Sequence, residues 1–234
     1  MFTIFNNGKN NKPKMTNEID GAWDLVSTEG KPSQGNVTFK AIDGYAFYSI
    51  YDIESKSFRA SMGGKMFKTD EGYSFFMEYD SSDASTVGST TPLEITFEGT
   101  KMTIISDGEG TMIFERIDDA QGEMAGAWRI TDRMRNGAMT AMQQGSRKTI
   151  KMLSGTRFQW VAYDPDSKSF SGTGGGTYTF KDGKYTETIE YHSKNSTRVG
   201  AVLPFDYEIN GNKWDHSGLS STGSPIREIW TRQD

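Results

Sequence analysis

The chain has 234 residues, a formal net charge of −5 and no cysteine. It can therefore form no disulfide, no thiolate metal site and no cysteine nucleophile. The absence of any run of five like charges argues against a nucleic-acid surface, which needs clustered lysine and arginine. No apolar stretch approaches the length of a membrane span.

The first 17 residues are mostly polar and are predicted to form a flexible tail, residues 1–17. They lack the long hydrophobic centre and the small-residue cleavage site of a secretory signal. As written, the chain is expected to be cytoplasmic. A secreted or periplasmic protein whose leader had been removed would have the same sequence.

Two copies of one sequence pattern follow this tail. Gly-Ala-Trp opens the first copy at residues 21–23 and the second at residues 126–128. An aromatic-x-Arg closes the copies at residues 114–116 and 230–232. The chain is therefore a tandem duplication, and we predict one domain over residues 18–118 and another over residues 119–234.

The spacing between matched residues changes once inside the repeat. The two tryptophans, Trp23 and Trp128, are 105 positions apart, whereas Tyr51 and Tyr163 are 112 apart, as are many later matches. The second copy thus carries seven extra residues within the stretch 132–151. The residues leave two interpretations of this stretch open, a solvated loop or a lid over a barrel mouth, and a short helix over 138–144 is predicted.

Short segments rich in aromatic and β-branched residues alternate with turn signals, which is typical of strands. Tight-turn pairs such as Asp43-Gly44, Asp182-Gly183 and Asn210-Gly211 separate several of them. Strands joined by such turns must be antiparallel. Predicted strands in chain order are residues 37–40, 45–51, 72–79, 93–97, 102–105, 111–116, 156–163, 176–180, 184–192, 201–209, 213–217 and 226–232.

These elements predict an all-β protein with two tandem antiparallel β-barrels of about eight strands each. Closure into a barrel removes the exposed sheet edges. Aromatic residues make up 12% of the chain, which suits small barrels with cores built from few large rings. Gly174–Gly176 lacks the Lys-Ser/Thr of a phosphate loop, so we expect it to permit a bent strand or a bulge.

The Gly-x-Trp motif with an arginine in the last strand resembles the calycin superfamily of lipocalins and fatty-acid-binding proteins. In lipocalins that tryptophan lies at the closed end of the barrel and the arginine packs across it. The resemblance implies lipocalin-like barrels closed by Trp23 with Arg116 and by Trp128 with Arg232. A guanidinium over an indole face adds about 1–2 kcal/mol of cation–π energy when shielded.

The second copy also resembles a bacterial lipocalin-like family of unknown function. The matching blocks are residues 157–160, 174–178, 185–187, 216–218 and 228–232. This resemblance implies the fold and no particular activity.

Comparison of the copies predicts where a ligand would bind. Both histidines lie in the second copy, where His192 and His216 replace Asp80 and Ile104. Three further positions differ in the same comparison. The second copy has Trp160 in place of Tyr48, Trp214 in place of Met102 and Glu228 in place of Met112. The second barrel is therefore the expected binding domain.

Strand parity places several of these side chains inside the second barrel. Trp214 and His216 share one face, as do Glu228, Trp230 and Arg232, and side chains two apart point the same way. For the strand 184–192 two orientations stay open, with either Ile189 and Tyr191 or Glu190 and His192 facing inward. The predicted ligand-binding residues are Trp160, Glu190, His192, Trp214, His216, Glu228 and Trp230.

We expect non-enzymatic binding of a small apolar or amphipathic molecule, with no cofactor, no metal and no nucleic acid. One alternative is a pair of solid barrels that act through their surface on a protein partner. A small-molecule enzyme using His216 and Glu228 is another, and a metal site of two histidines and a glutamate is a third. The spacing of the residues specifies neither of these last two.

Overall fold

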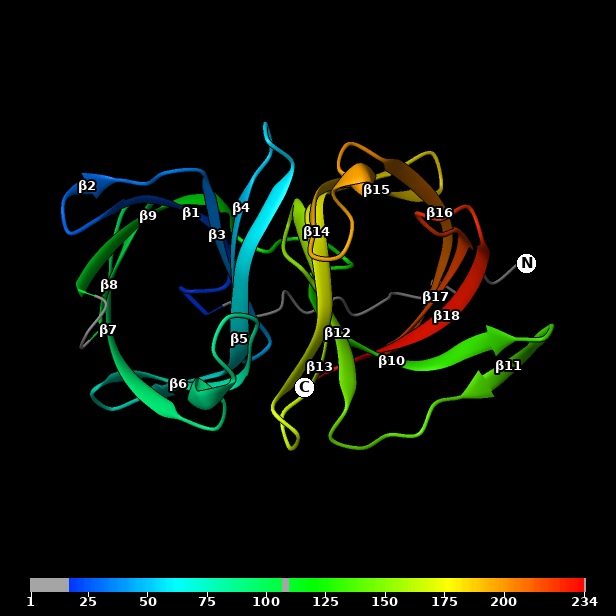
Figure 1. Cartoon of the computed structure of the whole chain (residues 1–234), viewed down its shortest axis with the longest axis horizontal. Coiled ribbons are helices and arrows are strands. Elements are labelled where there is room, and N and C mark those ends of the chain that lie inside the picture. The colour runs from blue at the N-terminus through cyan, green and yellow to red at the C-terminus, as the bar shows by residue number, and fades with distance from the viewer. Residues whose placement is uncertain (1–16, 107–109, 234) are drawn as a thin grey trace, which may run out of the picture.

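The computed structural model describes residues 17–106 and 110–233, and the predicted tail, residues 1–17, lies outside this part except for Asn17. The described residues form two closed antiparallel barrels, one per repeat, that lie side by side (Figure 1). The predicted all-β fold with about eight strands per barrel is confirmed.

The first barrel runs from β1 to β9 and closes through pairing of β1 with β9. Within the described residues eight strands complete the ring, and the short β2 pairs only with β1. The strands are β1 (Gly21–Thr28), β2 (Lys31–Pro32), β3 (Asn36–Ile42), β4 (Tyr45–Asp52), β5 (Ser57–Thr69), β6 (Gly72–Asp80), β7 (Thr90–Glu98), β8 (Lys101–Ser106) and β9 (Gly110–Asp118), with a 3₁₀ turn at Ala84–Thr86.

The second barrel repeats this order and closes through β10 and β18. Its strands are β10 (Gly126–Arg135), β11 (Ala138–Ala141), β12 (Lys148–Leu153), β13 (Arg157–Asp164), β14 (Ser169–Lys181), β15 (Lys184–His192), β16 (Val202–Asn210), β17 (Lys213–Leu219) and β18 (Pro225–Arg232), with a 3₁₀ turn at Ser196–Arg198. The hairpin of β10 and β11 projects away from the barrel (Figure 1).

The helix predicted over 138–144 is wrong. Asn136 and Gly137 both have positive φ (49° and 80°), as a tight hairpin turn requires, and β11 pairs with β10 from Ala138 to Ala141. Met142 then extends the ladder by donating its backbone N–H to the Thr131 carbonyl at 2.8 Å. The Asn-Gly turn signal therefore prevails over the helix formers that follow it.

A β-bulge bends the longest strand of each barrel at its glycines. The register shifts between Gly63 and Gly64 in β5 and between Gly175 and Gly176 in β14. A Cβ at Gly176 would come within 2.0 Å of the Thr188 carbonyl oxygen, so only glycine fits there. Gly174–Gly176 thus serves the predicted bend in the strand.

Three hydrophobic clusters build the molecule. One fills the first barrel around Trp23 and Phe114, and one fills the second barrel around Trp128, Trp214 and Trp230. The third lies between the barrels and joins residues of both, including Phe47 and Tyr163. The barrels therefore share a core instead of meeting only through a linker.

The contact between the barrels has an internal two-fold pattern. Tyr51 of the first barrel donates its hydroxyl to Glu190 of the second at 3.1 Å, and Tyr163 of the second donates to Glu78 of the first at 2.5 Å. Each tyrosine is 112 positions from the other, as is each glutamate. Equivalent surfaces of the two repeats thus face each other, as the two subunits of a symmetric dimer would.

Candidate functional site

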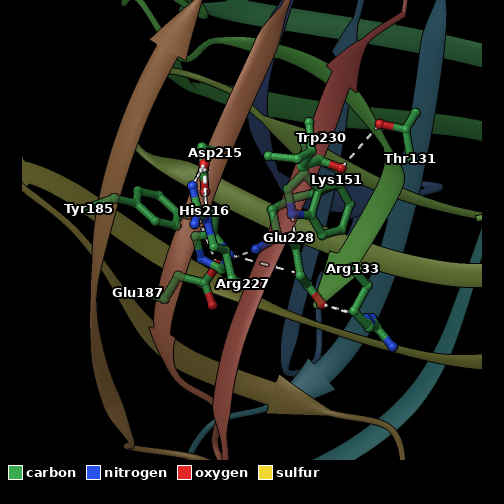
Figure 2. A network of polar contacts seen from close by, with 11 residues as sticks. Thr131, Arg133, Lys151, Tyr185, Glu187, Asp215, His216, Arg227, Glu228 and Trp230 are labelled. Carbon is green, nitrogen blue, oxygen red and sulfur yellow. Dashed lines mark hydrogen bonds and ion pairs between the residues drawn. The ribbon is translucent and has the colours of Figure 1, made fainter. Parts of the chain in front are cut away.

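The interior of the second barrel contains a group of charged and polar side chains that the first barrel lacks. Lys151, Glu187, His216 and Glu228 are all at least nine-tenths buried. At the corresponding positions the first barrel has Phe39, Phe75, Ile104 and Met112. Figure 2 shows these side chains, which come from four different strands, gathered in one region together with Tyr185 and Trp230.

Lys151 and Glu187 form a buried ion pair. Lys151 on β12 donates to Glu187 Oε1 on β15 at 2.7 Å, and the Tyr185 hydroxyl donates to the same oxygen at 2.8 Å. The Lys151 ammonium also lies 5.0 Å from a ring centroid of Trp230 and 5.3 Å from one of Trp214. Its charge is therefore balanced both by the carboxylate and by aromatic faces.

Glu228 on β18 is held from two sides. Its Oε1 accepts from Arg133 Nη2 at 2.8 Å and from Arg133 Nε at 3.1 Å, and its Oε2 accepts from Trp230 Nε1 at 3.2 Å. Arg133 is partly exposed, with 45% of its side-chain surface accessible, while Glu228 is buried. The pair therefore links the interior group to solvent.

His216 lies between these two pairs without a hydrogen bond of its own. Its side chain is 2% exposed, its Nδ1 is 3.8 Å from Glu228 Oε2, and neither ring nitrogen has a hydrogen-bond partner among the described residues. Burial, and secondarily the nearby Lys151 charge, lower the pKa of His216 well below its usual value. The imidazole is thus neutral at pH 7, with one donor and one acceptor unused.

Aromatic rings surround His216. Phe205 is 4.1 Å away between ring centroids, Trp214 is 5.0 Å away and Tyr185 is 5.8 Å away. The Trp214 indole nitrogen is also buried and has no hydrogen-bond partner within the described part of the chain. Trp160, Trp214 and Trp230 all belong to or pack against the interior cluster of this barrel, on the side that strand parity predicted.

The strand with Glu190 and His192 follows neither of the two predicted orientations. A bulge at Glu190 changes the parity, so Ile189 belongs to the interior cluster while Tyr191 points to the first barrel and contacts Ser49. His192 packs against Trp160 with ring centroids 5.6 Å apart, and Arg198 contacts its Nε2 at 2.7 Å.

Glu190 therefore lies outside the second barrel. It accepts from Tyr51 and from Arg157 Nη1 at 2.8 Å, in the contact between the barrels. The prediction of Glu190 as a residue that faces the ligand is corrected accordingly. Period-two alternation cannot reveal the extra residue of a bulge, which reverses the facing of every residue after it.

Each barrel has the same contact between an arginine of its last strand and a tryptophan of its first strand. The Arg116 guanidinium lies 3.9 Å from a Trp23 ring centroid, and that of Arg232 lies 4.3 Å from a Trp128 ring centroid. Both tryptophans are fully buried. Each indole N–H donates to a backbone carbonyl four residues earlier in the chain, at 3.0 Å for Trp23 and 2.9 Å for Trp128.

Two residues of the interior group, and one residue that contacts it from the surface, were not predicted from the sequence. Lys151, Glu187 and Arg133 were not among the predicted site residues. Matching the copies at the offset of 112 pairs Lys151 with Phe39 and Glu187 with Phe75, so the same comparison that identified His216 would have found them. Arg133 lies in the region of the seven-residue insertion, where the two copies cannot be matched residue by residue. Only the presence of its partner Glu228 could have indicated it.

Within residues 17–106 and 110–233, no group of three or more His, Asp or Glu side chains is arranged to hold a metal ion. The described chain also has no helix that is long and apolar enough to cross a membrane.

The geometry defines the molecule as a tandem pair of eight-stranded antiparallel barrels in which one interior is apolar and the other carries a polar group. Residues 123–234 match the model of a family described as a domain of unknown function (DUF4488). The match covers the second barrel, the one with the polar interior. No curated protein matches the chain.

Proposed function

We propose that the second barrel binds a small amphipathic molecule whose polar end meets His216 and Glu228. The observation that carries this proposal is the exchange of four apolar interior residues for Lys151, Glu187, His216 and Glu228. Burying charged groups costs free energy even when they are paired, so an interior that only supports the fold is generally as stable or more stable with apolar side chains. The first barrel would then support the second through their shared core.

The unused atoms of His216 and Trp214 support a binding role. A buried donor or acceptor without a partner costs about 1–3 kcal/mol. One ligand hydroxyl would accept from the Trp214 N–H and donate to the unprotonated nitrogen of His216. The surrounding rings would contact the apolar part of the same ligand, since binding sites usually combine apolar walls with a few placed polar groups.

The lipocalin-like relationship belongs to the same proposal. It is supported by the Trp–Arg closure at one end of each barrel and by the eight-stranded antiparallel ring. A lipocalin-like barrel is a natural container for a small amphipathic ligand.

One observation favours a second candidate, a solid barrel that acts as a protein-interaction module. The interior rings pack closely, with centroids 5.7 Å apart for Trp128 and Trp214 and 5.1 Å apart for Tyr185 and Trp214. Barrels of eight strands are often just wide enough to be filled by their own side chains. Such a barrel would bind no molecule in its interior.

A fluorescence titration of the full chain tests the proposal. The probe is N-phenyl-1-naphthylamine, a neutral amphipathic molecule that accepts energy from tryptophan. We expect saturable quenching of the tryptophan emission, and His216→Phe should weaken the binding at least tenfold. Ile104→Phe, at the matched position of the first barrel, is the control and should leave the binding unchanged. A linear, non-saturating response, or equal losses in both variants, would favour the solid barrel.

A further inference from the structure

The insertion that distinguishes the second repeat forms one wall of a surface groove. The groove has a volume of about 430 Å³ and lies between β10 and residues 141–149. Arg129 fixes this wall by donating to the backbone carbonyl of Gly145 at 2.6 Å and to that of Arg147 at 3.3 Å. Gln144 donates its side-chain amide to the Ile130 carbonyl at 3.4 Å. These hydrogen bonds fix the position of the wall, although it belongs to a segment that connects two strands.

The groove is strongly cationic in a chain whose net charge is −5. Arg129, Arg135, Arg147 and Lys148 line it, and its lining includes no aspartate or glutamate. Lys148 is neutralised by Glu78 of the first barrel at 2.7 Å, and Arg129 holds the wall. Arg135 and Arg147 are exposed and have no ion pair among the described residues.

The remaining lining matches a molecule with both an acidic group and an apolar body. Gln143 adds a side-chain amide to the lining, whereas the Ser146 hydroxyl is hydrogen-bonded to Asp164. At the base of the groove, Ile130 belongs to the interior cluster of the second barrel and Met142 packs against it. A volume of about 430 Å³ falls within the usual range for small-molecule sites, about 300–1,000 Å³.

We infer that this groove binds a small organic anion, with its carboxylate or phosphate between Arg135 and Arg147 and its apolar body against Met142. Arginine suits this role because its planar guanidinium donates two parallel hydrogen bonds to an oxyanion. The inference does not rest on the function proposed for the interior, because no residue of that polar group lines the groove.

Isothermal titration calorimetry on the full chain at low salt tests the inference, with phenyl phosphate and benzoate as the charged probes. Benzyl alcohol is the neutral counterpart, and inorganic phosphate tests whether the acidic group alone suffices. We expect both charged probes to bind, phenyl phosphate more tightly than inorganic phosphate, and benzyl alcohol at least tenfold more weakly than either charged probe. Binding should weaken with added salt.

The double variant Arg135→Gln/Arg147→Gln should weaken phenyl phosphate binding at least tenfold. The control, Arg59→Gln/Lys68→Gln, removes two exposed charges from β5 of the first barrel and should change the affinity less than twofold. His216→Phe should leave phenyl phosphate binding intact, which separates this site from the interior one. Equal losses in the two double variants, or no heat from either charged probe, would overturn the inference.

Discussion

At the scale of single residues, the two buried lysines of the structure differ in their partners. Lys151 has a carboxylate at 2.7 Å, whereas Lys40, which is 2% exposed, donates only to the Thr38 hydroxyl at 2.8 Å. Burial, and next the nearby Arg157 charge, lower the pKa of Lys40 from 10.5 to about 7. The corresponding residue of the second barrel is Met152, so an apolar side chain fits this place in the fold.

The pKa of Lys40 predicts how stability depends on pH. Between pH 7 and 10.5 the unfolded chain holds a proton on this amine that the folded chain has lost. Because the unfolded state then binds more protons, the free energy of unfolding should rise with pH from about 7 towards 9. Lys40→Met should flatten this rise and stabilise the protein at pH 7 by about 1–4 kcal/mol.

Urea unfolding of both proteins at several pH values measures this effect. Lys151→Met is the matched control and should destabilise the protein, because it leaves Glu187 buried without its cation. A Lys40→Met variant that is less stable than the parent at pH 7, or that keeps the same pH slope, would contradict the account.

At the scale of the elements, the bulges decide which face of a strand meets the barrel interior. The register shift opposite Gly176 places Glu190 and Tyr191 in the contact between the barrels and His192 beside Trp160. The same shift at Gly64 places Tyr79 in the shared core. Glycine is needed at these points because the neighbouring strand approaches too closely for a side chain.

Gly176→Ala should therefore be strongly destabilising. Its Cβ would lie 2.0 Å from the Thr188 carbonyl oxygen and 2.8 Å from the Glu190 backbone nitrogen, so the two strands must separate. We expect a loss of at least about 1–3 kcal/mol, as for other overpacked positions. Gly145→Ala is the control, since nothing lies within 4 Å of a Cβ there. Thermal unfolding followed by circular dichroism measures both, and equal midpoints for the two variants would show that the bulge does not need glycine.

The fold could be predicted from the sequence because the repeat and the tight-turn pairs are both visible in the order of the residues. The pairs Asp43-Gly44 and Asp182-Gly183 do adopt the positive φ angles that mark hairpins. The strands β5 and β14 were missed in whole or part, since their glycines interrupt the β-branched pattern on which strand prediction relies. The extent of each barrel follows from the repeat, whereas a bulge has no sequence period of its own.

The candidate site was predictable only in part, for a related reason. Trp214, His216, Glu228 and Trp230 lie on regular strands, so alternation placed them on the interior side. Glu190 is itself the extra residue of a bulge, and alternation fails there. Lys151 was missed because it falls in the stretch 132–151, which was interpreted as a loop or a lid, whereas the structure places it in β12.

At the scale of the whole molecule, the two repeats differ in their interiors while keeping one contact surface. The reciprocal Tyr51–Glu190 and Tyr163–Glu78 hydrogen bonds preserve the symmetry of that surface. Gln159 breaks this symmetry, because the first copy has Phe47 at the corresponding position. Its side-chain oxygen accepts from the Ser49 hydroxyl and its side-chain nitrogen donates to the Ser61 hydroxyl, at 3.0 Å each. The hydrophobic cluster inside the first barrel is built around Trp23 and Phe114, whereas Lys151, Glu187, His216 and Glu228 lie in the interior of the second barrel.

Mass spectrometry of the intact purified chain, under native and then denaturing conditions, tests the proposed binding function most directly. We expect the native protein to carry added mass, from a resident ligand or from N-phenyl-1-naphthylamine supplied to it, and unfolding to release this mass. His216→Phe should carry less of it. Equal native and denatured masses, both with and without the supplied probe, would contradict the claim that the second barrel holds a small molecule.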